Sequence, residues 1–324
     1  MQYARVVKTS LLSTVQDQGR AQLEHLGVRT GGAMDSFASR IANRLLGNAP
    51  DCAVLESTFG GDKLIFDGST QIAVTGAELE VQVNGLRHPM WSQIHINEGD
   101  ELALGFAREG ARAYISILGG WQTPRVLGSR ASDLAQALGD ETLDALSIEQ
   151  ALPYLKSDST TWRGLSYPSS RRMELYQSTN QIKRIRLIEG PEKPRLTKAF
   201  LKYCEQGVFT VGKESNRQAL TLESGSDSPA PLSEVGADIV SSYTTFGTIQ
   251  VPAHGRLTIL MADRQSTGGF ARIGQVAAAD LPVLGQMRQG QRLCFSWISI
   301  EEARSLQTYF ESMIDHALLS SPLN

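Results

Sequence analysis

Short apolar segments alternate with turn residues along most of this 324-residue chain. Runs of this length, bounded by polar residues, glycine or proline, are typical of β-strands. In the first half we interpret as strands the segments Thr70–Thr75, Leu79–Val83, Glu101–Phe106 and Ala111–Leu118. The dipeptide Asn84-Gly85 follows the second of them and favours a type I′ turn, which predicts a β-hairpin.

One amphipathic helix is predicted before the first of these strands. Its apolar face would consist of Phe37, Ile41 and Leu45. Asp35 or Ser36 can cap its N-terminus, because a short polar side chain there accepts a hydrogen bond from the first turn. The helix should end at Gly47-Asn48, where glycine permits a left-handed residue.

The second half repeats the pattern of short strands. We interpret as strands the segments Arg184–Ile188, Val208–Val211, Ala219–Leu222, Thr248–Val251, Arg256–Leu260 and Arg292–Trp297. Two helices are predicted, at Leu196–Cys204 and Glu301–Leu318. We predict a mainly β protein with a few helices and two β-barrel-like domains, because the strands are many and irregularly spaced. The domains are an N-terminal β-rich domain at 1–160 and a C-terminal β-rich domain at 181–324, joined by a polar linker at 161–180.

The composition indicates which classes of partner to expect. The chain has 31 Lys and Arg against 34 Asp and Glu, a net charge of −3, and no block of basic residues. We therefore expect neither nucleic acid nor a membrane as a partner. No apolar run approaches the length of a membrane span, and Met1–Arg5 lacks the apolar stretch of a signal peptide, so a cytoplasmic location is expected. The histidines and the three widely spaced cysteines show no metal-ligand spacing, so no metal site is predicted.

Two polar constellations are candidates for chemistry. One is Met261–Gly269, where charged and hydroxyl side chains precede Gly268-Gly269. The other is Thr14–Arg20, which is followed by Gly31-Gly32 and Asp35. Such stretches make a poor core but suit loops whose backbone approaches a ligand closely. We interpret both as loops of a ligand site.

These segments resemble the allophanate hydrolase subunit 2 family. The resemblance runs in order along nearly the whole chain through Leu55-Glu56, Val74–Ala77, Gly128–Arg130, Asn216-Arg217, Gly247–Pro252, Asp263–Gly269 and Ala279–Pro282. The family includes the C subunit of ATP-dependent 5-oxoprolinase, the carboxyltransferase portion of urea carboxylase, and the antagonist of a sporulation-kinase inhibitor. The resemblance implies cyclophilin-like barrels.

Residue chemistry and the resemblance together give the candidate site. The carboxylates expected to orient arginines or transfer protons are Asp17, Asp35, Glu56 and Asp263. Arginine forks suit a carboxylate, and glutamine amides suit a lactam or a urea-like amide. The residues expected to bind substrate are Gln16, Arg20, Gly32, Thr75, Gly76, Ser129, Arg130, Arg217, Gln250, Arg264, Gln265, Thr267, Gly268 and Gly269. Each of them alone also suits a structural brace, whereas the two loops as a set predict a ligand site.

The chain departs from the family after Gly128-Ser129-Arg130. Many relatives carry a glycine-rich stretch there, whereas residues 131–139 read Ala-Ser-Asp-Leu-Ala-Gln-Ala-Leu-Gly. Alanine and leucine favour helix where glycine opposes it, so this segment is helix-prone.

Three functions follow from the resemblance. The first is a component, like the C subunit, of an ATP-dependent 5-oxoprolinase that hydrolyses a lactam C–N bond with a B-subunit-like partner. The second is a biotin-dependent carboxyltransferase component acting on urea or a related amide, and the third is a non-enzymatic module that binds a kinase-inhibitor-like partner. Residues 207–213 have phosphate-loop spacing, but Glu214 replaces the hydroxyl residue that binds magnesium. We therefore expect no cofactor on this chain alone, with ATP or biotin on partner subunits, and no activity of the chain in isolation.

Overall fold

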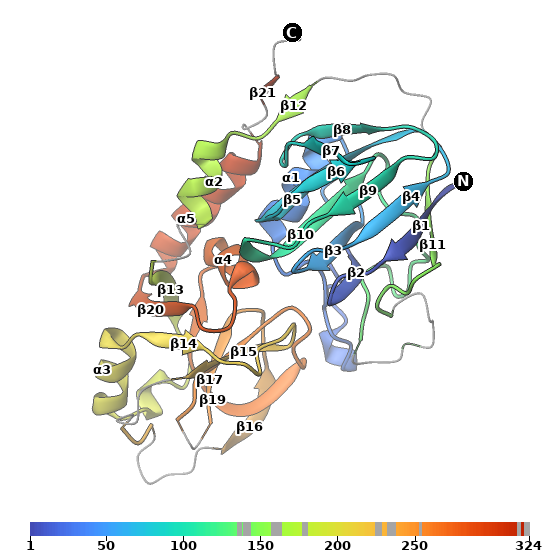
Figure 1. The fold of residues 1–324 in the computed structure, drawn as a ribbon. Coiled ribbons are helices and arrows are strands. Elements are labelled where there is room, and N and C mark those ends of the chain that lie inside the picture. Colours follow the sequence, from blue (N-terminus) through green and yellow to red (C-terminus); the bar gives the residue numbers. More distant parts are fainter. Residues whose placement is uncertain are drawn as a thin grey trace. The chain divides into compact units, whose positions relative to one another are not determined.

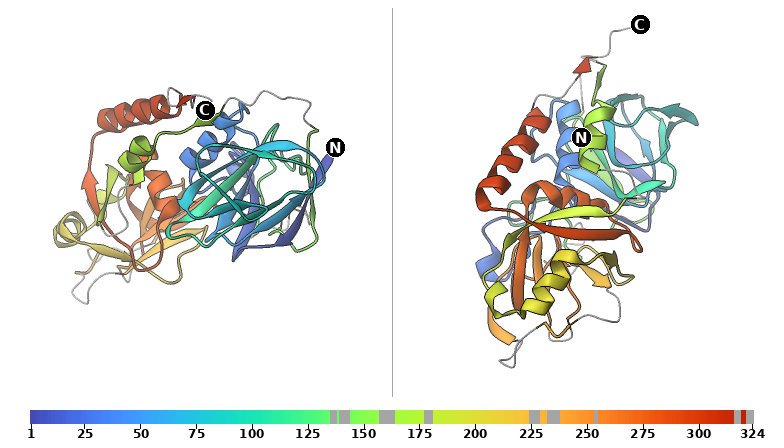
Figure 2. Two further views of the ribbon diagram at one scale, coloured as in Figure 1. Left: turned by 45° about the horizontal axis from the view of Figure 1, so that its top comes forward. Right: turned by 90° about the vertical axis from the view of Figure 1, so that its left-hand side faces the viewer.

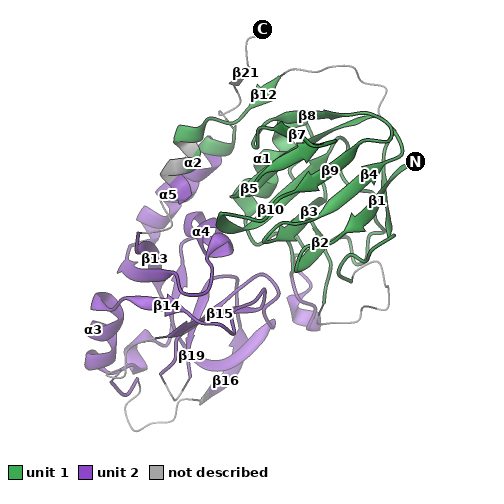
Figure 3. Cartoon of the chain, in the orientation of Figure 1, with its two compact units in different colours: residues 1–21, 31–174, 313–324 green, residues 22–30, 175–312 purple. Residues whose placement is uncertain are grey.

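The computed structural model describes residues 1–134, 138, 144–156, 164–176, 181–223, 229–231, 238–252, 255–315 and 319–320 (Figure 1). The chain divides into two compact units, which Figure 3 colours separately. Unit 1 consists of residues 1–21, 31–174 and 313–324, and unit 2 of residues 22–30 and 175–312. Within the described ranges, no helix has both the length and the apolar character needed to cross a membrane.

Unit 1 is built on two antiparallel sheets. The six-stranded sheet has the order β11 (Ala151–Tyr154), β1 (Gln2–Lys8), β4 (Lys63–Phe66), β9 (Glu101–Leu104), β6 (Val81–Val83) and β7 (Leu86–His88). The five-stranded sheet has the order β2 (Leu12–Gln16), β3 (Val54–Thr58), β10 (Glu109–Ile117), β5 (Thr70–Glu78) and β8 (Gln93–Ile96). A short pair, β12 (Leu165–Ser166) and β21 (Leu319–Ser320), completes the strands described in this unit.

The core of unit 1 consists of apolar side chains from both sheets. Val15, Leu55 and Ile115 of the five-stranded sheet belong to one buried cluster with Val6 and Leu64 of the six-stranded sheet. Because successive side chains of a strand point to opposite faces, the residues next to these point away from the core. That second face of the five-stranded sheet is polar, and helix α1 (Ser36–Leu45) packs on it over β5 and β10.

The local predictions for unit 1 are confirmed. The Asp35 side chain accepts a hydrogen bond from Ala38 N and so caps α1. Phe37, Ile41 and Leu45 are all fully buried on one side of that helix. Asn84 and Gly85 both have positive φ, at 51° and 79°, as a type I′ turn requires, and they join β6 to β7.

Unit 2 contains a closed barrel. Its sheet has the order β13 (Lys183–Glu189), β20 (Arg292–Trp297), β14 (Phe209–Val211), β15 (Ala219–Glu223), β18 (Thr258–Leu260), β17 (Thr248–Val251), β19 (Thr267–Val276) and β16 (Asp238–Tyr243). A further pairing of β13 with β19 closes the first seven strands into a ring and leaves β16 outside it. Mainly β architecture with barrel-like units, as predicted, is thereby confirmed.

Unit 2 also contains helices. Helix α3 (Lys198–Gln206) is capped by Thr197 and packs against β20 (Figure 1 and Figure 2). Helix α4 (Leu281–Gln286) also belongs to unit 2, as does α5 (Ile300–Asp315) up to residue 312, whereas α2 (Ser169–Tyr176) belongs to unit 1 up to residue 174. The barrel interior is apolar, and Leu187, Phe209, Ile249 and Leu293 are at most 1 % exposed.

Three sequence expectations need correction: two on loops and one on a helix-prone segment. Thr14–Gln16 is part of strand β2, and Thr267–Gly269 is the start of strand β19, so neither lies in a loop. The linker at 161–180 stays a prediction; β12 and α2 lie within this range, and residues 161–163 and 177–180 lie outside the described residues. Residues 131–134 form no helix, and 135–137 and 139 lie outside the described part of that segment. The predicted domain boundaries remain a proposal, from which the compact units differ at 22–30 and 313–324.

Candidate functional site

A row of polar side chains crosses the five-stranded sheet beneath α1. Thr14, Glu56, Tyr114 and Thr75 are direct neighbours on β2, β3, β10 and β5. None of the four is more than 1 % exposed. Buried polar groups are tolerated when they are hydrogen-bonded, so the contacts of this polar row decide what it does.

Tyr114 is the centre of the polar row. Its hydroxyl donates to Glu56 Oε2 over 2.8 Å and accepts from Asp35 N over 2.8 Å. Glu56 Oε2 also accepts from Met34 N over 2.9 Å, and Arg112 Nε lies 3.6 Å from Glu56 Oε1. Burial, followed by the charge of Glu56, raises the pKa of Tyr114 well above its ordinary value near 10, so the hydroxyl keeps its proton.

The structure brings three predicted site residues together under α1. Asp35 caps the helix, Glu56 accepts from the backbone just before it, and the Thr75 hydroxyl donates to Ala38 O over 2.7 Å. Gly76 follows with φ of 88°, and a Cβ there would collide with the carbonyl oxygen of Arg112. These contacts fix the N-terminus of α1 on the sheet, so they position the polar residues as a rigid group.

Asp17 joins three loops of unit 1. Its carboxylate accepts from Gly19 N over 2.7 Å, from Ser129 Oγ over 2.6 Å and from Arg130 N over 2.7 Å. Its carbonyl oxygen accepts from Ala33 N over 3.0 Å. The carboxylate of Asp17 is therefore occupied by donors from two segments that are far apart in sequence.

The loops around Asp17 approach each other closely. Gly32 has φ of 90°, and a Cβ there would lie 3.0 Å from Gln18 C, so only glycine fits comfortably. Arg20 is 2 % exposed and donates to Val126 O over 3.1 Å and to Ala131 O over 2.6 Å. The structure thus unites Asp17, Arg20, Gly32, Ser129 and Arg130, all of which were predicted as site residues.

Arg130 and Gln16 complete the predicted site residues of unit 1. Arg130 donates to Gln122 Oε1 over 2.9 Å, and partial burial lowers the pKa of its guanidinium. Gln16 is fully buried and its Nε2 donates to Thr14 Oγ1 over 3.1 Å. Its Oε1 has no hydrogen-bond partner within the described residues.

In unit 2, Arg217 and Asp263 form a buried bidentate ion pair. Arg217 Nε lies 2.7 Å from Asp263 Oδ2 and its terminal nitrogen lies 2.9 Å from Oδ1. The two residues are 4 % and 5 % exposed. Asp263 N also donates to Arg217 O over 2.9 Å, so the pair links the loop after β18 to residue 217 twice.

Arg264 is a buried cation with weak contacts. It is 6 % exposed, and it donates to Thr244 O and to Thr30 Oγ1, each over 3.3 Å. The Thr30 hydroxyl in turn donates to Glu24 Oε1 over 2.9 Å. Arg29 donates to Asp263 O over 3.0 Å. Among the described residues no carboxylate lies within ion-pair distance of Arg264, and burial lowers the pKa of its guanidinium.

Two glutamine amides lie against Gly268 at the start of β19. Gln250 comes from β17, and a Cβ at position 268 would collide with its Nε2. Gln265 Nε2 would lie 3.2 Å from the same Cβ. Gln250 is 3 % exposed, and its Nε2 has no acceptor in the described part of the chain. Two amide donors therefore lie near the Cα atom of a glycine, beside exposed Thr267 and half-buried Gly269.

Sequence reasoning missed the partners of these residues. Tyr114 and Arg112 were part of a strand predicted as apolar, although their spacing of two places them on one face. Thr30 and Glu24 belong to no motif. The bond from Arg264 to Thr30 spans 234 residues, so no local pattern could reveal it. For a metal, the described residues offer no group of three or more His, Cys, Asp or Glu at suitable spacing.

These features define a mainly β protein that combines a two-sheet unit with a closed barrel, each with a buried polar cluster. The chain belongs to the family described as carboxyltransferase domain, subdomain A and B, whose model matches residues 26–297. The family resemblance carried by the sequence motifs is thereby confirmed.

Relatives cover the chain almost completely. It is 29 % identical to the C subunit of 5-oxoprolinase from Escherichia coli over 95 % of this chain and 97 % of that protein. It is 27 % identical to urea amidolyase of Saccharomyces cerevisiae over 91 % of this chain and 16 % of that protein. The crystal structure of K. lactis urea amidolyase matches 97 % of this chain and 20 % of that chain, with a TM-score of 0.87 and 28 % identity.

Proposed function

We propose that this chain is the component of an ATP-dependent 5-oxoprolinase that corresponds to its C subunit and opens a lactam C–N bond with a B-subunit-like partner. The observation that carries the proposal is the pair of glutamine amides at Gly268, one of them without an acceptor in the described residues. A likeness to the C subunit of 5-oxoprolinase over 97 % of its length supports it, because that protein contains little beyond what this chain matches.

The chemistry follows from the donors. A lactam carbonyl oxygen is a strong acceptor, and negative charge develops on it when the carbonyl carbon is attacked. In the proposed site the amides of Gln250 and Gln265 donate to this oxygen, and Arg264 binds the carboxylate of the substrate. In this proposal water attacks the carbonyl carbon, the C–N bond breaks and the ring nitrogen takes up a proton. Hydrolysis of ATP to ADP and phosphate, on another protein of the complex, drives the opening.

A reconstituted complex tests the proposal. The chain is combined with A-subunit-like and B-subunit-like partners, and glutamate formed from 5-oxoproline and ATP is measured. Gln250→Ala should lower kcat by about 10²–10³, the usual cost of one lost oxyanion donor. Gln93→Ala is the matched control, because Gln93 is also a buried glutamine on a strand but donates to Leu45 O in unit 1. Its turnover per folded molecule should stay at the parent value.

The second candidate is carboxyl transfer to urea or a related amide from biotin held by a partner. The matched family model and the likeness to urea amidolyase favour it. The same complex distinguishes the two: bicarbonate-dependent turnover of urea with a biotin-carrying partner, together with no turnover of 5-oxoproline, would replace the first proposal with the second.

A further inference from the structure

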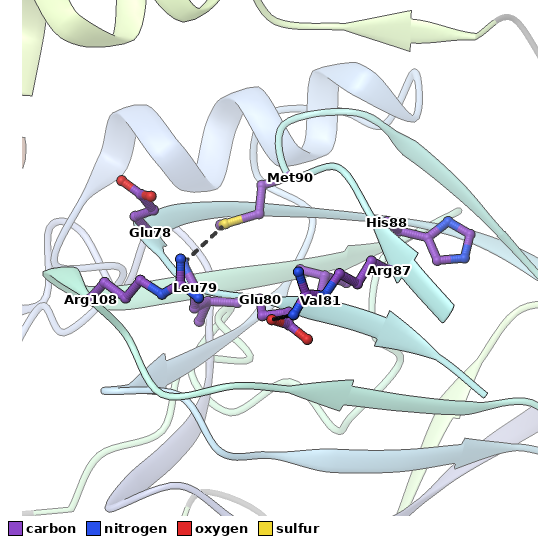
Figure 4. Close-up of a pocket in the computed structure, with 8 residues that line it drawn as sticks. All are labelled: Glu78, Leu79, Glu80, Val81, Arg87, His88, Met90 and Arg108. Carbon is purple, nitrogen blue, oxygen red and sulfur yellow. Dashed lines mark hydrogen bonds and ion pairs between the residues drawn. The ribbon is translucent and has the colours of Figure 1, made fainter. Parts of the chain in front are cut away.

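Unit 1 contains a pocket that is separate from the residues discussed so far. Its volume is about 180 Å³. A space of this size takes more than one water molecule, so it suits a small ligand. Figure 4 shows its lining: Glu78, Leu79, Glu80, Val81, Arg87, His88, Met90 and Arg108.

The pocket has an apolar floor. Leu79 and Val81 are 6 % and 1 % exposed, and Met90 packs against the core of unit 1. Figure 4 shows the Met90 side chain extending toward Leu79. An apolar floor with a few polar groups above it is the usual build of a small-molecule site.

One backbone N–H group in the pocket donates to a weak hydrogen-bond acceptor. Leu79 N donates to the thioether sulfur of Met90 over 3.4 Å. A thioether is a weak acceptor, so this backbone N–H gains from any oxygen that replaces the sulfur. Because methionine is flexible, its side chain can move aside at little cost.

The arginines that line the pocket determine which kind of oxygen ligand it can bind. Arg87 extends from β7 to Glu80 and pairs with it over 2.8 Å, so this guanidinium is engaged. Arg108 lines the same pocket, and its backbone N donates to Glu78 O over 2.7 Å. A guanidinium that lines the same pocket as a weakly bonded backbone N–H can form with it a donor pair suited to a carboxylate.

We propose that this pocket binds a small aliphatic carboxylate, with the carboxylate on Leu79 N and Arg108 and the aliphatic chain on Leu79, Val81 and Met90. The site lies outside the residues to which the proposed function assigns chemistry. A free acid and an amino acid share the chemistry that the pocket recognises, and an ammonium group would lie near Glu78 and Glu80.

Amide NMR of the full chain tests this site directly. Isovalerate is the probe, isovaleramide is its uncharged isostere, and valine adds the ammonium group. Isovalerate should give a saturable shift of the Leu79 amide proton and of the Met90 methyl group, and isovaleramide should bind at least about tenfold more weakly. A response to valine stronger than that to isovalerate would assign the site to amino acids, and a weaker one to free acids.

Three variants test which residues of the pocket bind the carboxylate. Arg108→Gln should weaken isovalerate binding at least about tenfold, the change expected for one charge-assisted hydrogen bond. Arg87→Gln is the control, because the Arg87 side chain is 77 % exposed and already paired with Glu80, so it should weaken binding less than Arg108→Gln does. Met90→Leu keeps the volume but removes the competing sulfur, so it should strengthen binding. Equal shifts with the acid and the amide, or equal losses in both arginine variants, would overturn the proposal.

Discussion

Tyr114→Phe removes a single oxygen atom from the centre of the polar row. The parent hydroxyl accepts from Asp35 N and donates to Glu56 Oε2, both over 2.8 Å. In the variant, Asp35 N loses this acceptor and Glu56 loses one donor, while the ring still fills its space. The side chain is fully buried, so water cannot easily replace either bond.

The expected cost follows from these two partners. A buried group that loses its hydrogen bond costs about 1–3 kcal/mol, with the larger values for charged groups. One neutral N–H and one carboxylate give an expected loss of about 2–5 kcal/mol in the free energy of unfolding. Tyr154→Phe is the matched control: Tyr154 is also fully buried, but its hydroxyl donates to a neutral acceptor, Gly68 O, over 2.8 Å. Its loss should be about 1 kcal/mol.

Urea unfolding at neutral pH measures both variants. The midpoint should fall clearly more for Tyr114→Phe than for Tyr154→Phe, at equal m-values. Equal losses would show that Glu56 and Asp35 find other partners without cost, and the reasoning on the polar row would fail. Turnover of the reconstituted complex per folded molecule should be unchanged if the polar row only positions α1.

Asp263→Asn should lower the free energy of unfolding by about 3–5 kcal/mol, because it removes the carboxylate that pairs with the buried guanidinium of Arg217; urea unfolding of this variant and of the double variant with Arg217→Met checks it, since the double variant should recover part of the loss. Hydrogen bonds from Arg272 hold the pKa of Glu192 below its ordinary value near 4.5, so this carboxylate stabilises the fold above that pH and the benefit disappears as the pH falls through its lowered pKa. Glu192→Gln should therefore flatten the decline of the urea midpoint between pH 6 and 3, and an unchanged decline would contradict it. Arg264→Ala should reduce turnover of the complex far more than it reduces melting temperature, because the contacts of Arg264 at 3.3 Å are weak braces; activity that falls only with the folded fraction would assign it a structural role.

Apolar segments were the part of the fold that the sequence revealed best. The strands around residues 70–83 and 101–118 and the helix at 36–45 were predicted because their apolar residues follow the strand or helix period. β3 was missed, since all five residues of Val54–Thr58 are buried although three are polar. Polar side chains look like loop residues until their hydrogen bonds are known, and those bonds come from other strands.

The candidate site, like the fold, could be predicted from the sequence only in part. Motifs identified Asp17 and Ser129, but only the fold places these residues, 112 positions apart, within 2.6 Å. Gly268 was predicted to lie in a loop because glycine is free in φ and lets the backbone approach a ligand closely. The structure places it instead in β19, where the Gln250 amide leaves no space for a Cβ. Composition suggested ligand chemistry for these residues, while their contacts decide which groups remain available for it.

The segment 22–30 has a consequence for synthesis of the chain. Arg29 and Thr30 bond to Asp263 and Arg264, which follow them by 234 residues. At about 5–20 residues per second, the ribosome needs about 12–47 s to make that stretch. Throughout this interval an early segment of the nascent chain must stay out of the folding sheets around it, because the loop that receives it has not yet been translated.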